Sequence, residues 1–397
     1  MMALEGIKVL ELGRVSPAEL PGMLLADMGA DVLKIDTPGG APLSDAAARK
    51  AAHAHTNRNK RSIALDLKAA EARAVFAELA ATADVIIEGF RPGVTARLGA
   101  DYETVRASNP RVVYCSLSGF GQSGPYRLRP AHDLNFLAFS GVLALMGRVG
   151  GEAPAIPLNL VADYGGASMH GALAIMFALF ARERTGVGQY IDISYLDATI
   201  ALLAATPNWR GVLSGNTIPR RGEGVFSGTY PYYAIYETRD RRLLSVACSE
   251  PPLWKNFCEA IGLPELARHA RRAEHYDRTA DAAEIAAREQ VAAVLKTRDL
   301  TSWEQQFVAL DVCVAPVNEV DEMLRDPQVR HRATLTEVAH PRWGAVRQID
   351  SPLRMSDTPP RLRSAAPLPG EHTRAVLASL GRDAAAIESL LERGIVG

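Results

Sequence analysis

The chain lacks the features that mark several large classes of protein. Its four cysteines, Cys115, Cys248, Cys258 and Cys313, show no Cys-x-x-Cys spacing, which favours buried reduced thiols over disulfides or a metal site. No stretch approaches the roughly 18 apolar residues that a membrane span needs, and no charged leader precedes an apolar core at the N-terminus. The formal net charge is −1, so no bulk attraction to nucleic acid or an anionic membrane is expected. We therefore expect a cytoplasmic protein without a metal centre.

What the chain does have is the composition of an ordinary globular protein, with 48% hydrophobic and 22% charged residues. Its 397 residues exceed what one hydrophobic core usually supports, so two domains are expected. Residues 208–228 are rich in Gly, Arg and Ser and suit a linker. We expect a large domain that begins with 1–207, a smaller α+β domain over 229–325, and a return segment, 326–397, that completes the large domain.

Strand and helix patterns alternate through the first two hundred residues. A strand at 7–12, a helix at 17–28 and a strand at 31–35 form one unit, and the alternation continues with strands at 62–67, 84–88, 111–117 and 190–193. This predicts an open, Rossmann-like, mostly parallel sheet covered by helices. The first turn, Leu12–Pro17, has one glycine where a dinucleotide fingerprint needs three, which argues against a nicotinamide or flavin cofactor.

Two segments supply an imidazole and a carboxylate, groups suited to moving a proton near neutral pH. His132 follows a glycine-containing loop that we place at the carboxyl end of a strand, where open α/β sheets carry their chemistry. Asp163 precedes an amphipathic run, Ala167 to Arg182, so its carboxylate should lie at a helix N-terminus, where the macrodipole favours the charged form. There it can be a base, a nucleophile or only a helix cap, and a lone histidine in a loop can equally be structural.

Charged residues elsewhere have both functional and structural interpretations. The basic cluster Arg58, Lys60 and Arg61 stands just before a strand, and it is either a solvated loop or a site for the phosphates of an anionic ligand. Glu250 follows a strand of the smaller domain and precedes Pro251, so it needs no role beyond starting a helix.

The segments around Gly119–Pro125, His132 and Asp163 occur in an order that resembles the family III coenzyme A transferases. The His132 segment resembles the α-methylacyl-CoA racemase branch of that family. The similarity covers essentially the whole chain and is strongest over 83–197. It implies that His132 and Asp163 act on opposite faces of the α-carbon of a 2-methylacyl-CoA, through an enolate, while Glu250 orients the histidine.

The resemblance also implies the coenzyme A contacts and the assembly. No cofactor is implied beyond the coenzyme A of the substrate, and the implied assembly is an interlocked homodimer whose site lies between the large domain of one subunit and the small domain of the other. The implied contacts come from Lys34, from the basic cluster, from Leu65, Asp66, Leu67 and Lys68, from Glu88, Gly89, Phe90 and Arg91, and from Ala131, Asp133, Leu134, Asn135 and Phe136.

Three positions depart from the family pattern. The loop Ser16–Pro21 replaces a Gly-Pro-Gly-Pro-aromatic sequence and would reshape the acyl or thioester pocket. Thr37 stands where racemases often have Arg, and Ala131 where Gly is common. None of these changes touches His132 or Asp163, so they affect the expected substrate more than the expected reaction.

Transferases of the family typically use the aspartate at the position of Asp163 as a nucleophile that forms acyl and coenzyme A thioester intermediates. They usually lack a histidine at position 132, and the formyl-CoA type has a glutamine where this chain has Ser16. Both differences favour proton transfer. A racemase is therefore our first expectation, a CoA transferase the second, and a non-catalytic acyl-CoA-binding protein the third.

Overall fold

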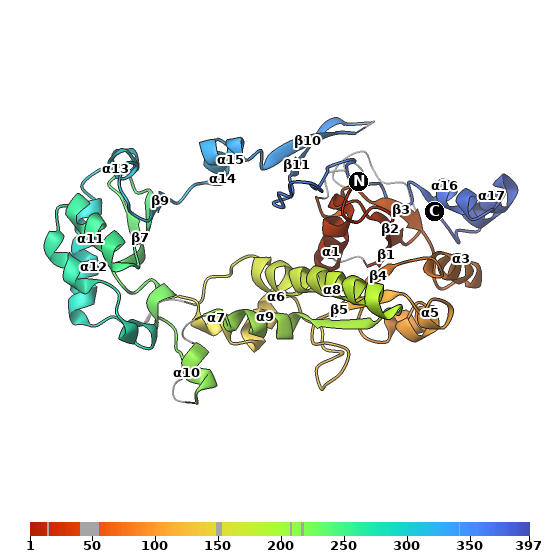
Figure 1. Ribbon diagram of the computed structural model, residues 1–397, viewed down its shortest axis with the longest axis horizontal. Helices are drawn as coiled ribbons and strands as arrows, with labels where there is room; N and C mark the ends of the chain where they lie inside the picture. Colours follow the sequence, from red (N-terminus) through yellow and green to blue (C-terminus); the bar gives the residue numbers. More distant parts are fainter. Residues whose placement is uncertain (14–15, 40–54, 148–152, 207–208, 216–217, 341) are drawn as a thin grey trace. The chain divides into compact units, whose positions relative to one another are not determined.

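The computed structural model describes residues 1–397 except 14–15, 40–54, 148–152, 207–208, 216–217 and 341. The chain divides into two compact units, each of which has its own sheet (Figure 1). The second unit consists of Leu137–Pro157 and Ile200–Met323, so residues 137–157 group with it, whereas the sequence analysis placed them in the large domain. The first unit consists of Met1–Phe136, Leu158–Thr199 and Leu324–Gly397.

A six-stranded sheet of order β3-β2-β1-β4-β5-β6 organises the first unit, and every neighbouring pair in it is parallel. This order confirms the expected Rossmann-like sheet and places the topological switch between β1 and β4, beside which such sheets bind ligands. The strands are β1 (Lys8–Leu12), β2 (Asp31–Asp36), β3 (Arg61–Ala64), β4 (Val85–Glu88), β5 (Val113–Ser118) and β6 (Tyr190–Ser194).

The helices of this unit begin where the sequence supplies suitable first-turn residues. α1 (Ser16–Asp27) has Pro17 in its first turn, where a missing N–H costs nothing. Asp101 caps α5 (Tyr102–Ser108) by accepting a hydrogen bond from the Thr104 N–H at 3.2 Å. Other elements of the unit are α3 (Ala70–Ala80), α4 (Val94–Leu98), the start of α6 (Asp133–Phe139), α8 (Met169–Thr185), the start of α9 (Tyr195–Leu203), α15 (Pro327–His331), the antiparallel pair β10 (Leu335–His340) and β11 (Gly344–Ile349), and η1 (His55–Asn57).

The C-terminal segment adds two helices, α16 (Thr373–Ser379) and α17 (Ala384–Glu392). They are separated at Gly381, whose φ of 85° is one that L residues rarely adopt. Asp383 then caps α17 by accepting the Ala386 N–H at 2.8 Å. Because Val376 of α16 joins the buried cluster of the parallel sheet, this segment is part of the first unit's core.

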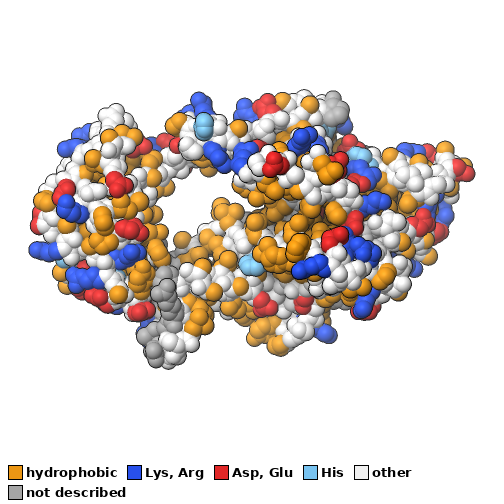
Figure 2. Space-filling model, in the orientation of Figure 1, with side chains coloured by type: hydrophobic (Ala, Val, Ile, Leu, Met, Phe, Trp, Pro, Cys, Tyr) orange, Lys and Arg blue, Asp and Glu red, His pale blue; other side chains and the backbone are white. Residues whose placement is uncertain are grey.

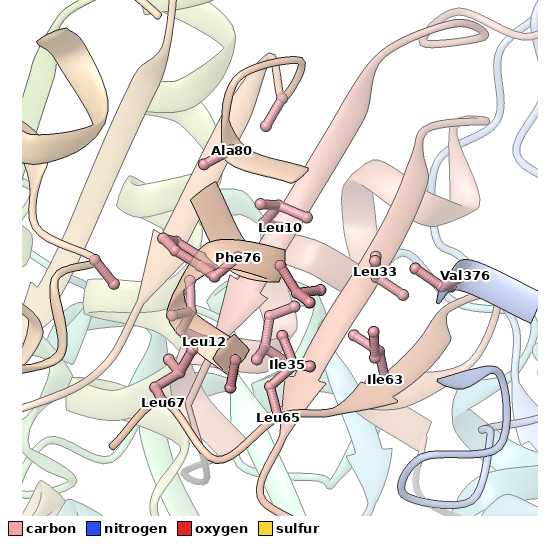
Figure 3. Packing of buried hydrophobic residues seen from close by; sticks show 14 of the residues in the cluster. Leu10, Leu12, Leu33, Ile35, Ile63, Leu65, Leu67, Phe76, Ala80 and Val376 are labelled. Atoms are coloured by element: carbon pink, nitrogen blue, oxygen red, sulfur yellow. The ribbon is translucent and has the colours of Figure 1, made fainter. Parts of the chain in front are cut away.

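One large buried cluster of the first unit lies on the face of the sheet shown in Figure 3. Leu10 and Leu12 of β1 and Ile35 of β2 pack there with Phe76 of α3 and Ile63 of β3 (Figure 3). β4 and β5 are buried along their whole length, as expected of central strands in a parallel sheet covered on both faces. The carboxyl ends of these strands are therefore held by a close-packed core.

The second unit is built on a three-stranded antiparallel sheet of order β7-β8-β9 together with several helices, which confirms the expected smaller α+β domain. Trp254, Phe257 and Trp303 are almost fully buried in its core. The stretch expected as a linker contains α10 and η3, and its residues 208 and 216–217 lie outside the described ranges. The elements are α7 (Val142–Leu145), α10 (Trp209–Leu213), η3 (Val225–Ser227), β7 (Tyr233–Glu237), β8 (Leu243–Ala247), α11 (Pro251–Ala260), η4 (Pro264–His269), η5 (Ala273–Tyr276), α12 (Ala282–Leu295), α13 (Leu300–Phe307), β9 (Val314–Pro316) and α14 (Val320–Met323).

Candidate active site

A cavity of about 360 Å³ lies at the carboxyl ends of β4 and β5 in the first unit, beside the topological switch. Both His132 and Asp163 line it, so the structure brings together the two groups that the sequence singled out. The other lining residues are Pro17, Gly89, Phe90, Arg91, Pro92, Leu117, Ser118, Gly119, Arg127, Arg129, Pro130, Ala131, Asn135, Phe136 and Tyr195.

Asp133 ties the two segments of this site to each other. Its Oδ2 accepts hydrogen bonds from the backbone N–H groups of Ala162 and Asp163, both at 2.9 Å. Asp133 is buried, so water competes little for these bonds. Because Asp133 directly follows His132, the two bonds hold the chain at His132 against the chain at Asp163.

Asp163 lies in the first turn of a π-helical stretch, Leu160–Ser168 (η2), that runs directly into α8. This confirms the expected place of Asp163 at a helix N-terminus, although the helical stretch begins before Asp163 and not after it. The Ser168 hydroxyl lies 2.7 Å from the Asp163 carbonyl oxygen and 2.6 Å from that of Pro17, which anchors the stretch to α1. π-Helical segments occur frequently at functional sites.

The Asp163 carboxyl is less acidic than its helical position suggests. Burial raises its pKa to about 6, and the negative charge of Asp133 adds to this rise. A hydrogen bond from the Asn159 amide, at 3.4 Å, and the nearby His132 imidazole act in the opposite direction. At pH 7 a carboxyl with this pKa is still mostly charged, and the contribution of the macrodipole stays a prediction. A carboxyl with such a pKa can both take up and release a proton near neutral pH.

His132 is exposed at the rim of the cavity, immediately before α6. Its backbone N–H donates to Oδ1 of Asn135 at 3.0 Å, which fixes the chain at the helix start. The charge of the His132 imidazole lowers the pKa of Asp163, so the two side chains are close enough to interact electrostatically. The site thus offers an accessible imidazole and a half-buried carboxyl in one cavity.

A second cavity, of about 300 Å³, lies at the carboxyl ends of β2 and β3. Phe90 lines both cavities, so the two adjoin at this residue. Four of the expected coenzyme A contacts, Leu65, Asp66, Leu67 and Lys68, line the second cavity. It is also lined by Leu12, Ile35, Asp36, Thr37 and Leu98.

Glu88 fixes the loop at Gly89 and Phe90, which lies between the two cavities. This buried carboxylate accepts the Phe90 N–H at 2.7 Å, and burial raises its pKa to about 7. Gly89 approaches α1 so closely that an added Cβ would lie 2.6 Å from the Cβ of Ala18. The loop therefore needs glycine at this position, and Glu88 supports the loop without lining either cavity.

Each residue of the basic cluster pairs with a carboxylate of this chain. Lys60, 2% exposed, donates to both carboxylate oxygens of Glu11 at 2.7 and 2.8 Å, and Arg58 pairs with the buried Asp27 at 2.6 Å. Arg61 pairs with Asp31 at the surface. None of the three lines either cavity. The structure gives Arg58 and Lys60 a structural role, and their contact with phosphate stays a prediction.

Lys34 and Leu134 also lie off the lining of the two cavities. Lys34 is paired with Glu19 at 2.7 Å.

In the second unit, Glu250 stands at the N-terminus of α11 before Pro251 and accepts a hydrogen bond from the Ser249 hydroxyl at 3.0 Å. This matches the helix-start interpretation, and the role of Glu250 in orienting a histidine stays a prediction.

Within the described ranges, no group of three or more His, Cys, Asp or Glu side chains is placed to hold a metal ion. All four cysteines are free, and Cys313 is exposed, unlike the buried thiol that the sequence analysis expected. By length and composition alone, Leu160–Thr185 could cross a membrane, but 44% of its most apolar window is buried inside the protein.

Among the residues that line the first cavity, the sequence analysis did not name Arg127, Arg129 or Tyr195 as site residues. A signal for Tyr195 was present, because it directly follows the last strand of the parallel sheet. That position is the carboxyl end of β6, on the edge of the sheet where ligands bind.

Comparison with known proteins identifies the family. The model of CoA-transferase family III matches residues 4–373. The chain belongs to this family. It is 35% identical over 386 residues to the alpha-methylacyl-CoA racemase of Mus musculus, covering 96% of this chain and 94% of that protein. It is also 33% identical to a succinate–glutarate CoA-transferase of Agrobacterium fabrum, covering 95% of each.

A solved structure supports the same assignment. The CAIB/BAIF family protein from Brucella suis superimposes with a TM-score of 0.79 at 30% identity, covering 96% of this chain and 99% of that one. Racemases and CoA-transferases are thus similar to this chain to nearly the same degree, so the choice between the two reactions rests on the site.

Proposed function

We propose that this family member is a racemase that interconverts the (R) and (S) forms of 2-methylacyl-CoA thioesters. The observation that carries the proposal is the placement of His132 and Asp163 in one cavity, with the pKa of Asp163 raised to about 6. Inverting an α-carbon requires a proton acceptor on one face and a proton donor on the other. A carboxyl and an imidazole that can each act as base or as acid meet this requirement in both directions.

The chemistry follows from these two side chains. In one direction the Asp163 carboxylate removes the α-proton, the electron pair of the C–H bond forms an enolate, and the protonated His132 returns a proton to the opposite face. In the other direction neutral His132 is the base and protonated Asp163 is the acid. No electrons leave the substrate, so the reaction requires no redox cofactor.

Coenzyme A would run from the second cavity past Phe90 into the first. This path places the nucleotide at the carboxyl ends of β2 and β3 and the thioester beside His132 and Asp163. Lys68 and Arg91 are exposed along it, and neither forms an ion pair within the described part of the chain. Their free positive charges suit the phosphates of the nucleotide.

The second candidate is a CoA transferase, in which Asp163 attacks the thioester and becomes a covalent intermediate. The 33% identity to the succinate–glutarate CoA-transferase favours it. We place the racemase first because the cavity contains His132, which the nucleophilic route does not need. The third candidate is an acyl-CoA-binding protein without activity.

This chain has an exposed apolar surface on α8 that could form the interface of the expected homodimer. On α8, Leu173, Met176, Phe177 and Phe180 are 38–66% exposed, and Figure 2 shows hydrophobic side chains gathered over this helix. Exposed apolar surface of this kind is typical of a contact with another chain. We propose that a second copy covers it. The cytoplasmic location stays a prediction.

The test uses one stereoisomer of a 2-methylacyl-CoA in deuterated water, with no carboxylic acid, metal or nicotinamide added. NMR follows loss of the α-hydrogen, and chiral chromatography of the released acid follows inversion. Exchange with inversion supports the racemase. Coenzyme A transfer that appears only when a free acid is added identifies the transferase, and saturable binding with neither reaction identifies a binding protein.

A further inference from the structure

Tyr195 stands at the edge of the candidate active site without a role in the proton transfer described above. It begins α9, directly after β6, and lines the cavity with His132 and Asp163. Its ring stacks on Phe136, with centroids 5.2 Å apart and an angle of 21° between the planes. At 8% exposure, Tyr195 is held firmly at the wall of the cavity.

The hydroxyl of Tyr195 differs from those of other buried tyrosines. Tyr114, Tyr230 and Tyr236 each donate to a backbone carbonyl oxygen, at 2.6–2.8 Å. Within the described ranges, no protein group pairs with the Tyr195 hydroxyl, and it is not sealed in the core. Buried tyrosine hydroxyls usually find a partner. A hydroxyl left open to a cavity is therefore suited to bind the occupant of that cavity.

The electrostatic setting makes this hydroxyl a donor. Burial, followed by the negative charge of Asp163, raises the pKa of Tyr195 above its usual value. Cys115, Glu88 and Tyr164 act in the same direction. The phenol therefore keeps its proton near neutral pH. The influence of Asp163 also places the hydroxyl near the carboxyl that we assign to proton transfer.

We propose that Tyr195 is a catalytic residue that donates a hydrogen bond to the thioester oxygen of the bound acyl-CoA and stabilises the enolate. This inference rests on the proposed racemase function. When the base, Asp163 or His132, takes the α-proton, the C–H electron pair becomes the π bond between Cα and the carbonyl carbon. The carbonyl π pair moves to oxygen, which accepts the hydrogen bond while Tyr195 keeps its proton. Protonation of Cα on the opposite face reverses these shifts and restores the thioester with inverted configuration.

The enolate oxygen carries more charge than the thioester oxygen, so the hydrogen bond is stronger in the transition state than in the ground state. Tyr195→Phe keeps the ring that stacks on Phe136 and removes only the donor. Loss of one such donor typically lowers kcat by about 10²–10³-fold. We expect that loss in Tyr195→Phe, with KM for 2-methylacyl-CoA nearly unchanged.

Tyr190→Phe is the matched control. The Tyr190 hydroxyl bonds to the Ser116 hydroxyl at 3.0 Å, and Tyr190 lies off the lining of the active-site cavity. Its variant should exchange the α-hydrogen at nearly the wild-type rate. A non-reactive alkyl thioether of coenzyme A should bind wild type and Tyr195→Phe equally, which verifies that the variant has an intact site.

A second measurement uses a coenzyme A thioether that carries a planar nitronate, which mimics the enolate and its charge. Tyr195→Phe should lose affinity for this mimic by about the factor that it loses in kcat. Wild-type exchange together with an unimpaired Tyr195→Phe variant would overturn the role of Tyr195 and leave the racemase intact. Absence of exchange by the wild-type protein would overturn the racemase, and this inference with it.

Discussion

The Oδ2 atom of Asp133 lies 2.9 Å from the backbone nitrogen of Asp163. Through this hydrogen bond, the residue next to His132 fixes the position of the other proposed proton-transfer group. The same carboxylate raises the pKa of Asp163 through its negative charge, after the larger effect of burial. One buried side chain therefore both positions the site and adjusts its acidity.

The pH dependence of racemisation should reflect this arrangement. In the direction in which Asp163 is the base, kcat/KM should fall as the pH drops below about 6, because the Asp163 carboxyl becomes protonated there. Asp133→Asn keeps a carbonyl acceptor but removes the charge that raises the pKa of Asp163. The acid limb of the pH–rate profile should therefore move to lower pH. An acid limb that stays in place, with thermal stability unchanged, would contradict the electrostatic role of Asp133.

The buried pair of Lys60 and Glu11 should contribute to stability and leave substrate binding unaffected. Lys60→Ala leaves Glu11 buried without its cation, which typically costs about 3–5 kcal/mol. We expect a lower free energy of unfolding in urea, with KM for acyl-CoA unchanged in the folded fraction. The double variant Glu11→Gln/Lys60→Met should recover part of the loss, because no unpaired charge remains. A raised KM without loss of stability would instead support the contact of Lys60 with phosphate.

Lys68 and Arg91 should contribute to the binding of acyl-CoA and not to the chemical step. Replacing either with Ala should raise KM for acyl-CoA with little change in kcat, because the phosphates are held alike in the ground and transition states. Arg97→Ala is the matched control, since Arg97 is exposed on α4 and lines neither cavity. Equal KM values in all three variants would place the nucleotide elsewhere.

The sequence predicted the parallel sheet well because its central strands, β4 and β5, are largely apolar runs that are buried along their whole length, as burial on both faces of a sheet requires. It could not predict the details that depend on tertiary contacts. The pKa of Asp163 follows from burial and from Asp133, which only the folded chain brings to it. Likewise, Lys60 resembles a surface cation in the sequence, and only the fold places Glu11 of β1 against it.

The sequence predicted part of the candidate active site and missed another part, because some of its features depend on tertiary contacts. His132 and Asp163 were found because imidazole and carboxylate carry recognisable chemistry and the family order supported them. Tyr195 was missed because an aromatic residue after a strand is usually part of the core. Its open hydroxyl becomes visible only when the lining of the cavity is known.

The central claim is that His132 and Asp163 transfer protons on opposite faces of the α-carbon. The most direct measurement compares racemisation of a 2-methylacyl-CoA by wild type, His132→Ala and Asp163→Asn, with the intact mass of each protein recorded after mixing. Both variants should lose activity by about 10²–10⁴-fold, the usual scale of general acid–base catalysis, and the wild-type mass should not change. A fully active His132→Ala variant, together with a coenzyme A adduct on Asp163 of the wild type, would contradict the account and establish the transferase in its place.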